Sequence, residues 1–248
     1  MPLETINGLV LFGTDYREND KILTVLSPEK GKLSIASRGC KRSSSTLLSA
    51  SEQFAFSEMV VVENYGRYTL KEAYVKELFY PLRNDYLKFA AAAFIMQASD
   101  HISFLGEPNS IFFTMLYHVL SYLAYTDIEP FDIVICFMAR LLFISGMASS
   151  ITSCAVCGKS VADSKLICFS PKAGGSLCHN CDDGSRMVSS LSLEALRRMF
   201  RIPDKRIRDV VLPKKTRQEL AAVLDDYFEY VLEHRFKTYE FFINSIEL

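Results

Sequence analysis

Four cysteines in two closely spaced pairs are the residues of this chain best suited to chemistry. Cys154 and Cys157 form one C-x-x-C pair, and Cys178 and Cys181 form a second pair after twenty intervening residues. Each pair can turn two thiolates toward one tetrahedral ion, and this spacing is typical of zinc ribbons. The alternative is four unrelated buried thiols. Because four thiolates would leave no position for water, the pattern predicts one structural zinc per chain and no catalytic metal.

Other metal-ligating side chains lie close to the two pairs. His179 is inside the second pair and could replace a thiolate, but we expect it to be exposed. Cys168 lies in an apolar run at residues 166–169, where a packed core thiol is the expected role. Cys40 and Cys136 are expected to be spare thiols as well. Whether Cys168 or His179 touches the metal is left open by the sequence.

No motif of a known catalytic class is present. A zinc deaminase needs H-x-E beside a three-ligand zinc, whereas this chain has His-Asn-Cys at residues 179–181. The G-x-S-x-G, Walker and dinucleotide-binding glycine patterns are absent. His101, His118 and His234 fall on predicted helices without a nucleophile partner. The chain is therefore predicted not to be an enzyme, with a zinc hydrolase as a rival hypothesis.

Two clusters of basic residues could contact phosphates. The first consists of Arg38, Lys41 and Arg42, with Lys32 just before them. The second begins with three arginines and continues through a basic connector: Arg197, Arg198, Arg201, Lys205, Arg206, Arg208, Lys214, Lys215 and Arg217. Such groups give salt-dependent, sequence-tolerant affinity for nucleic acid. The alternative is an ordinary solvated face.

The total charge hides this local clustering. The chain has 248 residues, with 28 basic and 29 acidic side chains and a net charge of −1. Residues 190–217 alone carry nine basic and three acidic side chains, and residues 218–248 carry two and seven. Tyr65, Tyr68 and Tyr74 could stack on bases or pack in a core. DNA binding is therefore permitted, but charge alone does not predict that it is tight.

Residues 1–80 must position the first basic cluster, and they show the pattern of β-strands. Short runs rich in β-branched and aromatic residues are separated by turn residues. Leu33 and Ile35 alternate with polar or small neighbours, as in a half-buried strand. Five strands in about 80 residues favour a small barrel or sandwich. The predicted strands cover residues 8–12, 21–26, 32–36, 54–62 and 68–74.

From residue 81 onward the periodicity is helical. Helices are predicted over residues 86–105, 110–125 and 131–145, with Pro108 and Pro130 at the starts of the last two. They are nearly apolar all round and should pack as a buried bundle. The apolar stretch at 131–148 contains Asp132 and Arg140, which disfavours a membrane span. The lack of a signal peptide and the odd number of cysteines predict a cytoplasmic protein.

The last sixty residues carry helix-start signals of their own. Ser192 is the predicted N-cap of a short helix that runs to about Phe200. Thr216 and Glu219 form a T-x-x-E pattern, which predicts a capping box. Apolar residues then follow at helical spacing, so an amphipathic helix is expected, with a break near Lys237.

Taken in order, these features resemble one family, RecO, the bacterial recombination mediators. The cysteine segment 153–181, with Phe-Ser-Pro at 169–171 and Gly-Gly at 174–175, is similar to the zinc motif of that family. The tail also matches in pattern and ends in Arg-x-Lys-x-x-Glu-Phe at 235–241. The opening segments resemble its N-terminal domain in their order along the chain: residues 8–12, 15–26, 31–36 and 38–42.

The resemblance implies an α+β protein. Residues 1–80 would be an OB-fold DNA-binding barrel, and residues 81–248 a helical domain with a four-cysteine zinc finger inserted at 150–189. It also implies a non-enzymatic, nucleoid-associated protein that binds single- and double-stranded DNA and anneals complementary strands. RecR, the C-terminal peptide of single-strand-binding protein and, indirectly, RecA are the implied partners. The implied DNA contacts are Lys32, Arg38, Lys41, Arg42, Arg197, Arg198 and Arg201. The alternative is a protein–protein adaptor with a structural zinc site that does not bind DNA.

Overall fold

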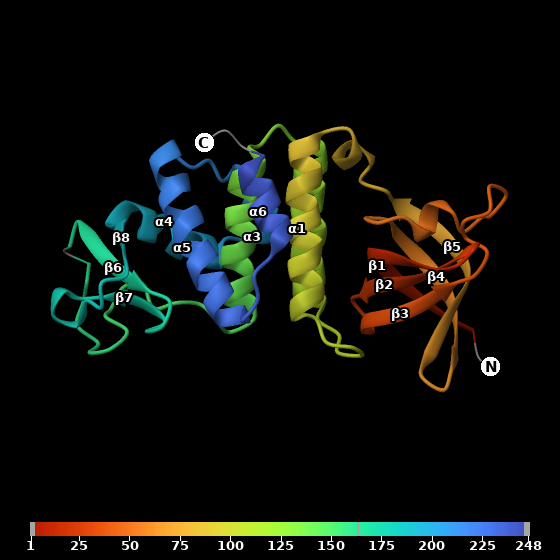
Figure 1. Ribbon diagram of the computed structural model, residues 1–248, viewed down its shortest axis with the longest axis horizontal. Helices are drawn as coiled ribbons and strands as arrows, with labels where there is room; N and C mark the ends of the chain where they lie inside the picture. Colours follow the sequence, from red (N-terminus) through yellow and green to blue (C-terminus); the bar gives the residue numbers. More distant parts are fainter. Residues whose placement is uncertain (1–2, 163, 246–248) are drawn as a thin grey trace. The chain divides into compact units, whose positions relative to one another are not determined.

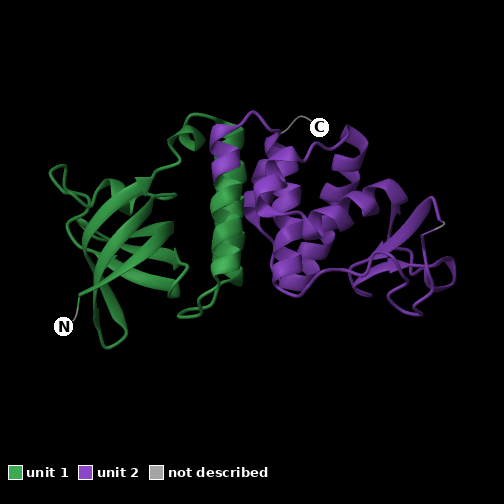
Figure 2. Ribbon diagram, turned by 180° about the vertical axis from the view of Figure 1, so that it is seen from behind, with its two compact units in different colours: residues 1–120 green, residues 121–248 purple. Residues whose placement is uncertain are grey.

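The computed structural model describes residues 3–162 and 164–245. The chain divides into two compact units, residues 1–120 and residues 121–248 (Figures 1 and 2). The dividing point falls inside helix α2 (Ser110–Tyr125), whose N-terminal part belongs to the first unit. The boundary expected at residue 80 follows the last barrel strand and stays a prediction.

The first unit opens with a closed five-stranded barrel. Its strands are β1 (Leu3–Arg17), β2 (Asp20–Ser27), β3 (Gly31–Ser37), β4 (Phe56–Asn64) and β5 (Arg67–Glu77). The order around the barrel is β1-β2-β3-β5-β4. An antiparallel pairing of β1 with β4 closes it, and β3 runs parallel to β5. Because this is the strand order of an OB-fold, the predicted OB-fold barrel is confirmed.

Alternation along the strands fills the barrel, as the sequence predicts. Leu33 and Ile35 are buried, whereas Lys32, which precedes Leu33, and Ser34, which lies between the two, are not. The interior is lined with branched aliphatic side chains, with Cys40 among them as a packed thiol. The barrel core includes Ile6, Val10, Leu23, Val25, Leu33, Ile35, Met59, Val61 and Leu70.

A segment that follows the barrel returns to it. A short 3₁₀ helix, η1 (Ser49–Ser51), lies between β3 and β4, and a second, η2 (Tyr80–Arg83), follows β5. Helix α1 (Tyr86–Ile102) comes next, and its N-cap is Asp85, whose carboxylate accepts the Lys88 amide. The loop after α1 folds back onto the start of β3, where the Gly106 amide donates to the Lys32 carbonyl at 3.0 Å. The loop and the turn between β2 and β3 therefore lie in direct contact.

Substituting Gly31 with alanine should destabilise the first unit by more than about 2 kcal/mol. Gly31 has a φ of +70°, and a Cβ there would lie 2.2 Å from the carbonyl oxygen of Glu107. Gly66→Ala is the matched control, because Gly66 has a φ of +75° and no atom within 4 Å of the added Cβ. That control should lose only about 1 kcal/mol. Denaturant unfolding, followed by amide exchange in β2 and β3, measures the stability of both variants. Equal losses of stability in the two variants would contradict the close approach of Gly31 to Glu107.

The second unit is built on helix α3 (Pro130–Ile144), which packs against α4 (Ser190–Arg201) and α5 (Lys214–Leu232). Every residue from Phe131 to Leu142 is buried, as expected for a helix that is apolar all round. Pro130 occupies the first turn as predicted. In the described residues, no helix is long and apolar enough to span a membrane. The final helix breaks as predicted, since α6 (Lys237–Asn244) follows α5 after a gap that contains Glu233 at a φ of +49°.

Two predicted helix caps are wrong. The side chain of Ser189, not Ser192, caps α4 and accepts the Ser192 amide. The T-x-x-E pattern caps nothing, because α5 begins at Lys214 and Pro213 is its N-cap. The Glu219 carboxylate instead accepts hydrogen bonds from both Ser189 and Ser192. Glu219 therefore joins α5 to the N-terminus of α4, a contact between residues about thirty apart in the chain.

The predicted insertion at residues 150–189 is a small three-stranded sheet with loops. Its strands β6 (Leu166–Ser170), β7 (Gly175–Leu177) and β8 (Arg186–Ser189) are antiparallel in the order β7-β6-β8. Gly175, at a φ of +149°, lies so close to Ser150 that a Cβ would be 2.1 Å from the Ser150 carbonyl oxygen. The amide of Ser150 bonds to Gly174, and its carbonyl accepts the Ser176 amide. This pairing joins the sheet to the chain that leads into the first cysteine pair.

Candidate metal centre and basic surfaces

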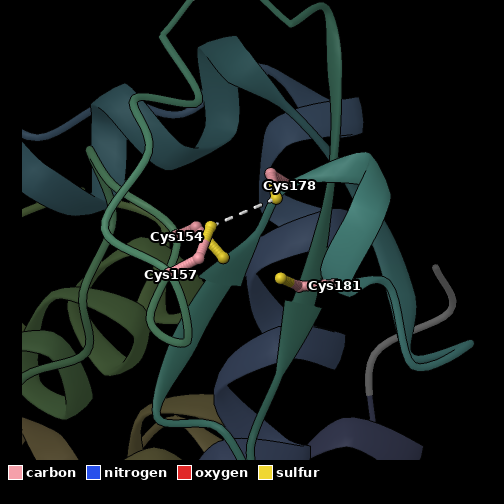
Figure 3. Close-up of side chains that lie close together, drawn as sticks. All are labelled: Cys154, Cys157, Cys178 and Cys181. Carbon is pink, nitrogen blue, oxygen red and sulfur yellow. Dashed lines mark hydrogen bonds between the residues drawn. The ribbon is translucent and has the colours of Figure 1, made fainter.

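The structure brings the four predicted cysteines together. Cys154 and Cys157 lie in the loop before β6, Cys178 directly follows β7, and Cys181 ends the 3₁₀ helix η3 (His179–Cys181). Their sulfur atoms all lie within 4.8 Å of one another and point into a common space (Figure 3). The Sγ atoms of Cys157 and Cys178 are 3.6 Å apart. Four bonds of about 2.3 Å in a tetrahedron separate sulfurs by about 3.8 Å, so the arrangement fits one tetrahedral ion.

Tight backbone turns hold each pair in place. The Gly158 amide donates to the Cys154 carbonyl at 2.9 Å, and Gly158 has a φ of +74°. The Cys181 amide donates to the Cys178 carbonyl at the same distance. The Ala155 amide donates to the Ser176 carbonyl, which fastens the first turn to β7. Backbone hydrogen bonds therefore fix both C-x-x-C turns without help from a metal ion.

The electrostatics around the thiols also suit a cation. Backbone N–H groups of Cys178 and Cys157 point at the Cys154 sulfur and lower its pKa to about 6. Hydrogen bonds that the Cys181 thiol donates to the sulfurs of Cys178 and Cys157 favour its protonated form and raise its pKa to about 12. The cluster therefore holds a Cys154 thiolate stabilised by amides beside the Cys181 thiol, which ionises only with help. A bound dication would supply that help, and four sulfurs would leave it no open position for substrate.

The neighbouring candidates do not join this centre. His179 is exposed, as expected, and is not part of the group of close sulfurs. Cys168 is buried on β6, and burial raises the pKa of its thiol to about 11. The carboxylates of Asp182 and Asp183 lie close to its thiol, and the pKa of Asp183 falls to about 2 because Ser170 and Ser185 donate to it. Cys168 is thus the packed thiol that the sequence predicts.

The first basic cluster lies in the loop that leaves β3. Two hydrogen bonds anchor this loop where β1 turns into β2: the Lys41 amide donates to the Asn19 carbonyl, and the Gly39 amide donates to the Asp20 carboxylate. Arg38 and Arg42 are exposed, and neither forms an ion pair with any residue that the structure describes. The cluster therefore presents two uncompensated guanidinium groups on the barrel.

The two lysines of this cluster have intramolecular partners. Lys41 pairs with Asp15 at 2.6 Å on the surface. Lys32 donates to both the backbone carbonyl and the carboxylate of Asp100 on α1, at 2.7 and 3.1 Å. Their role in DNA contact stays a prediction, and for Lys32 a phosphate would have to compete with a partly buried pair.

The three arginines that begin the second basic cluster lie on the exposed side of α4. Leu193, Leu196 and Met199 are buried against the unit, so Arg197 and Arg198 face solvent. Both pair with Glu194 at about 3 Å, and these arginines lower the pKa of that carboxyl. Arg201 is exposed, and no acidic partner lies within ion-pair distance in the described part of the chain. Arg217, counted in the same segment, is bound to Asp132 instead.

Sequence reasoning missed two arginines of the barrel. Arg17 ends β1 and Arg67 begins β5, and each is exposed. Both lie next to a tyrosine or glycine at the end of a hairpin, and this neighbourhood is the sequence feature that could have indicated an exposed binding residue. Both line one surface hollow together with Arg38. Arg67 reaches this hollow because β3 pairs with β5, a pairing that no local sequence pattern reveals.

Comparison with known proteins places the whole chain in one group of sequences. Residues 1–79 match the family model described as recombination protein O N terminal, and residues 83–240 match recombination protein O C terminal. A DNA repair protein RecO of Desulforamulus reducens is 33% identical over 97% of this chain and 94% of its own length. Proteins of the same name from Moorella thermoacetica and Acetivibrio thermocellus are 27% and 29% identical. They cover 96% and 95% of this chain, and 90% and 94% of their own lengths.

Proposed function

This chain belongs to the RecO family of DNA repair proteins, and on that premise we propose that it binds DNA and anneals complementary single strands. The observation that carries the proposal is the OB-fold barrel with Arg38 and Arg42 uncompensated on its surface. Guanidinium groups that lack a protein carboxylate are free to neutralise phosphates. Neutralising two strands at once reduces their repulsion and permits pairing without base-specific contacts.

We propose zinc as the ion at the four cysteines, with a structural role. Four residues would hold the ion: Cys154, Cys157, Cys178 and Cys181. The ion would cross-link the loop before β6 to η3. With no open ligand position, this centre supports a binding protein rather than an enzyme. The arrangement therefore favours the DNA-binding mediator over the zinc hydrolase.

The partners follow from the same proposal. Recruitment by RecR and by the C-terminal peptide of single-strand-binding protein would compensate for the near-zero net charge of the chain, and loading of RecA would follow indirectly. The site of action would then be the cytoplasmic nucleoid. A protein–protein adaptor whose arginines are merely solvated is the competing function, and it differs in one measurable property: it would not anneal DNA.

Reversing the charge of Arg38, Lys41 and Arg42 together to glutamate should greatly slow the annealing of complementary oligonucleotides. Three single-strand phosphate contacts account for a salt slope of about 2 and for about a 20-fold change in affinity between 50 and 200 mM salt. The matched control exchanges the same residues with charge retained, as Arg38→Lys, Lys41→Arg and Arg42→Lys. That variant should keep most of the annealing rate, because phosphate contacts tolerate such exchange when charge dominates.

Fluorescence annealing kinetics and a salt titration of binding measure this difference. Wild-type protein that binds and anneals with a steep salt dependence, together with a defective reversal variant, supports the proposal. Wild-type binding that ignores salt, or a reversal variant that anneals normally, would overturn the role of this loop. Absence of any annealing by the wild-type protein would favour the adaptor.

A further inference from the structure

The four sulfurs of the metal centre differ in how far solvent can reach them. Cys154 is 2% exposed, Cys178 and Cys181 are half-buried, and Cys157 is exposed. The residue before it, Val156, is 65% exposed, so the tip of the first C-x-x-C turn projects into solvent. A cysteine is oxidised only where the oxidant can reach its sulfur. Cys157 is therefore the ligand that a small oxidant meets first.

A second sulfur lies beside Cys157. The Sγ atoms of Cys157 and Cys178 are 3.6 Å apart (Figure 3). A disulfide joins its sulfurs at about 2.0 Å, so these two need to approach each other by roughly 1.6 Å. The loop and the strand that carry them are already joined by backbone, because the Ala155 amide donates to the Ser176 carbonyl at 2.8 Å. A disulfide between Cys157 and Cys178 can therefore form while this backbone pairing persists.

The other cysteines are shielded from such a reaction. Cys40 lies in the barrel core, Cys136 on α3 and Cys168 on β6. Their exposed fractions are 1%, 0% and 3%. Burial keeps a thiol away from an oxidant as long as the fold is intact. These three thiols therefore report within the same molecule whether an oxidation is selective or follows unfolding.

The loop that carries Cys157 also covers the start of helix α4. A hollow of about 280 Å³ is lined by Val161 of this loop and by Leu193 and Arg197 of α4. Val161 and Leu193 are 3% and 2% exposed. At the first residue of α4, the Ser190 amide donates to the Lys165 carbonyl at 3.0 Å. Whatever loosens the loop therefore removes cover from the first turn of α4.

We propose that the four-cysteine centre is a peroxide-responsive switch, in which a disulfide between Cys157 and Cys178 replaces the metal and loosens the loop that covers α4. This inference rests on the proposed function, in which zinc occupies the four sulfurs, and adds a means of regulating it. Thiol reductants reverse the change, because a disulfide that is accessible to solvent undergoes thiol–disulfide exchange.

The chemistry balances with hydrogen peroxide as the oxidant. The Cys157 thiolate attacks one peroxide oxygen, so that an S–O bond forms, the O–O bond breaks and hydroxide leaves. The Cys178 thiolate then attacks the Cys157 sulfur, so that an S–S bond forms, the S–O bond breaks and a second hydroxide leaves. The two thiolates lose two electrons, the peroxide gains them, and two protons from solvent convert the hydroxides to water. Cys154 and Cys181 remain as two ligands, too few for a structural zinc site.

The first test treats the zinc-loaded full chain with hydrogen peroxide. A chromogenic chelator should detect the release of one zinc per chain, and peptide mass mapping should find one disulfide, between Cys157 and Cys178. Addition of a thiol reductant and zinc should restore the metal content. Retention of zinc, or a disulfide between Cys154 and Cys157, would overturn the proposal. Oxidation of Cys136 at the same rate as Cys157 would also overturn it, because the reaction would then follow unfolding.

A matched variant tests whether a third thiol takes part. Cys168→Ser removes a sulfur that lies in the same ribbon but outside the group of four close sulfurs. It should release zinc at the wild-type rate, with its thermal unfolding midpoint as the check on folding. Slower release by Cys168→Ser would show that Cys168 supplies the second sulfur and would overturn the pairing with Cys178. Alkylation of Cys168 in the oxidised wild-type protein, after denaturation, checks the same point without any substitution.

The second test follows α4. Amide hydrogen exchange of residues 191–194 should become faster in the oxidised protein than in the zinc-loaded protein, and should return after reduction with zinc. Exchange in the barrel strand β2 is the internal reference and should not change. Unchanged exchange at residues 191–194 in the oxidised protein would overturn the link between the centre and α4.

These outcomes separate the failure of this inference from the failure of the proposed function. If the full chain binds no zinc, the proposed role of the four cysteines fails. If the chain holds one zinc but peroxide neither releases it nor joins Cys157 to Cys178, only the switch fails. The annealing of DNA by the reduced, zinc-loaded protein decides the proposed function in either case.

Discussion

Replacing Cys157 with serine should lower the zinc affinity of the chain by about a hundredfold or more. Structural zinc sites bind with about 10–16 kcal/mol, so one of four thiolates carries roughly 3 kcal/mol. Cys157 is the most exposed of the four ligands, and its substitution leaves no cavity in a core. Zinc content after dialysis against a graded chelator series, read by elemental analysis, measures the change.

The design of this experiment depends on two controls. His179→Ala removes the imidazole that lies between Cys178 and Cys181 in sequence, and zinc content should stay at one per chain because the side chain is exposed. Complete removal of zinc from the wild-type protein should expose residues 150–189 to proteolysis, since β6, β7 and β8 form only a small sheet. A Cys157→Ser variant that retains wild-type affinity, or a His179→Ala variant that loses zinc, would contradict the four-sulfur site.

Local signals were sufficient where the structure follows local rules. The five barrel strands follow from alternation and turn residues, and α3 follows from an apolar run that begins at Pro130. The cysteine centre follows from spacing, because a C-x-x-C turn fixes its two sulfurs with only local backbone bonds. In each of these elements, the decisive contacts join residues that are close together in the sequence.

The errors and omissions lie where distant residues compete. Glu219 has the sequence position of a capping-box residue, but a better set of donors is available at Ser189 and Ser192. Lys32 looks free in the sequence, yet α1 brings Asp100 to it across 68 positions. The hollow between Arg17 and Arg67 exists only because β3 pairs with β5. A single sequence contains no signal for such pairings, so candidate charges could be named but not sorted into free and engaged ones.

Replacing Asp132 with alanine should cost about 3–5 kcal/mol of stability in the second unit. The Asp132 side chain is 2% exposed and accepts two hydrogen bonds from Arg217, at 2.7 and 3.0 Å, and one from the Leu212 amide at 3.0 Å. Alanine would leave a largely buried guanidinium and a buried amide without their acceptor, and both losses add to the cost. Asp132→Asn keeps an acceptor at nearly the same volume and should lose less.

The exposed ion pair of Arg206 and Asp209 is the control for the buried pair of Asp132 and Arg217. Both side chains are exposed at 70% and 48%, so Arg206→Ala should change stability by less than about 1 kcal/mol. Hydrogen exchange of α3 and α5 amides under native conditions measures all three variants in the unit concerned. If Asp132→Ala costs no more than Arg206→Ala, the buried pair is not a structural link. If the large loss is found, Arg217 is committed to α3. The positive charge that this basic segment offers to DNA is then smaller by one than its composition indicates.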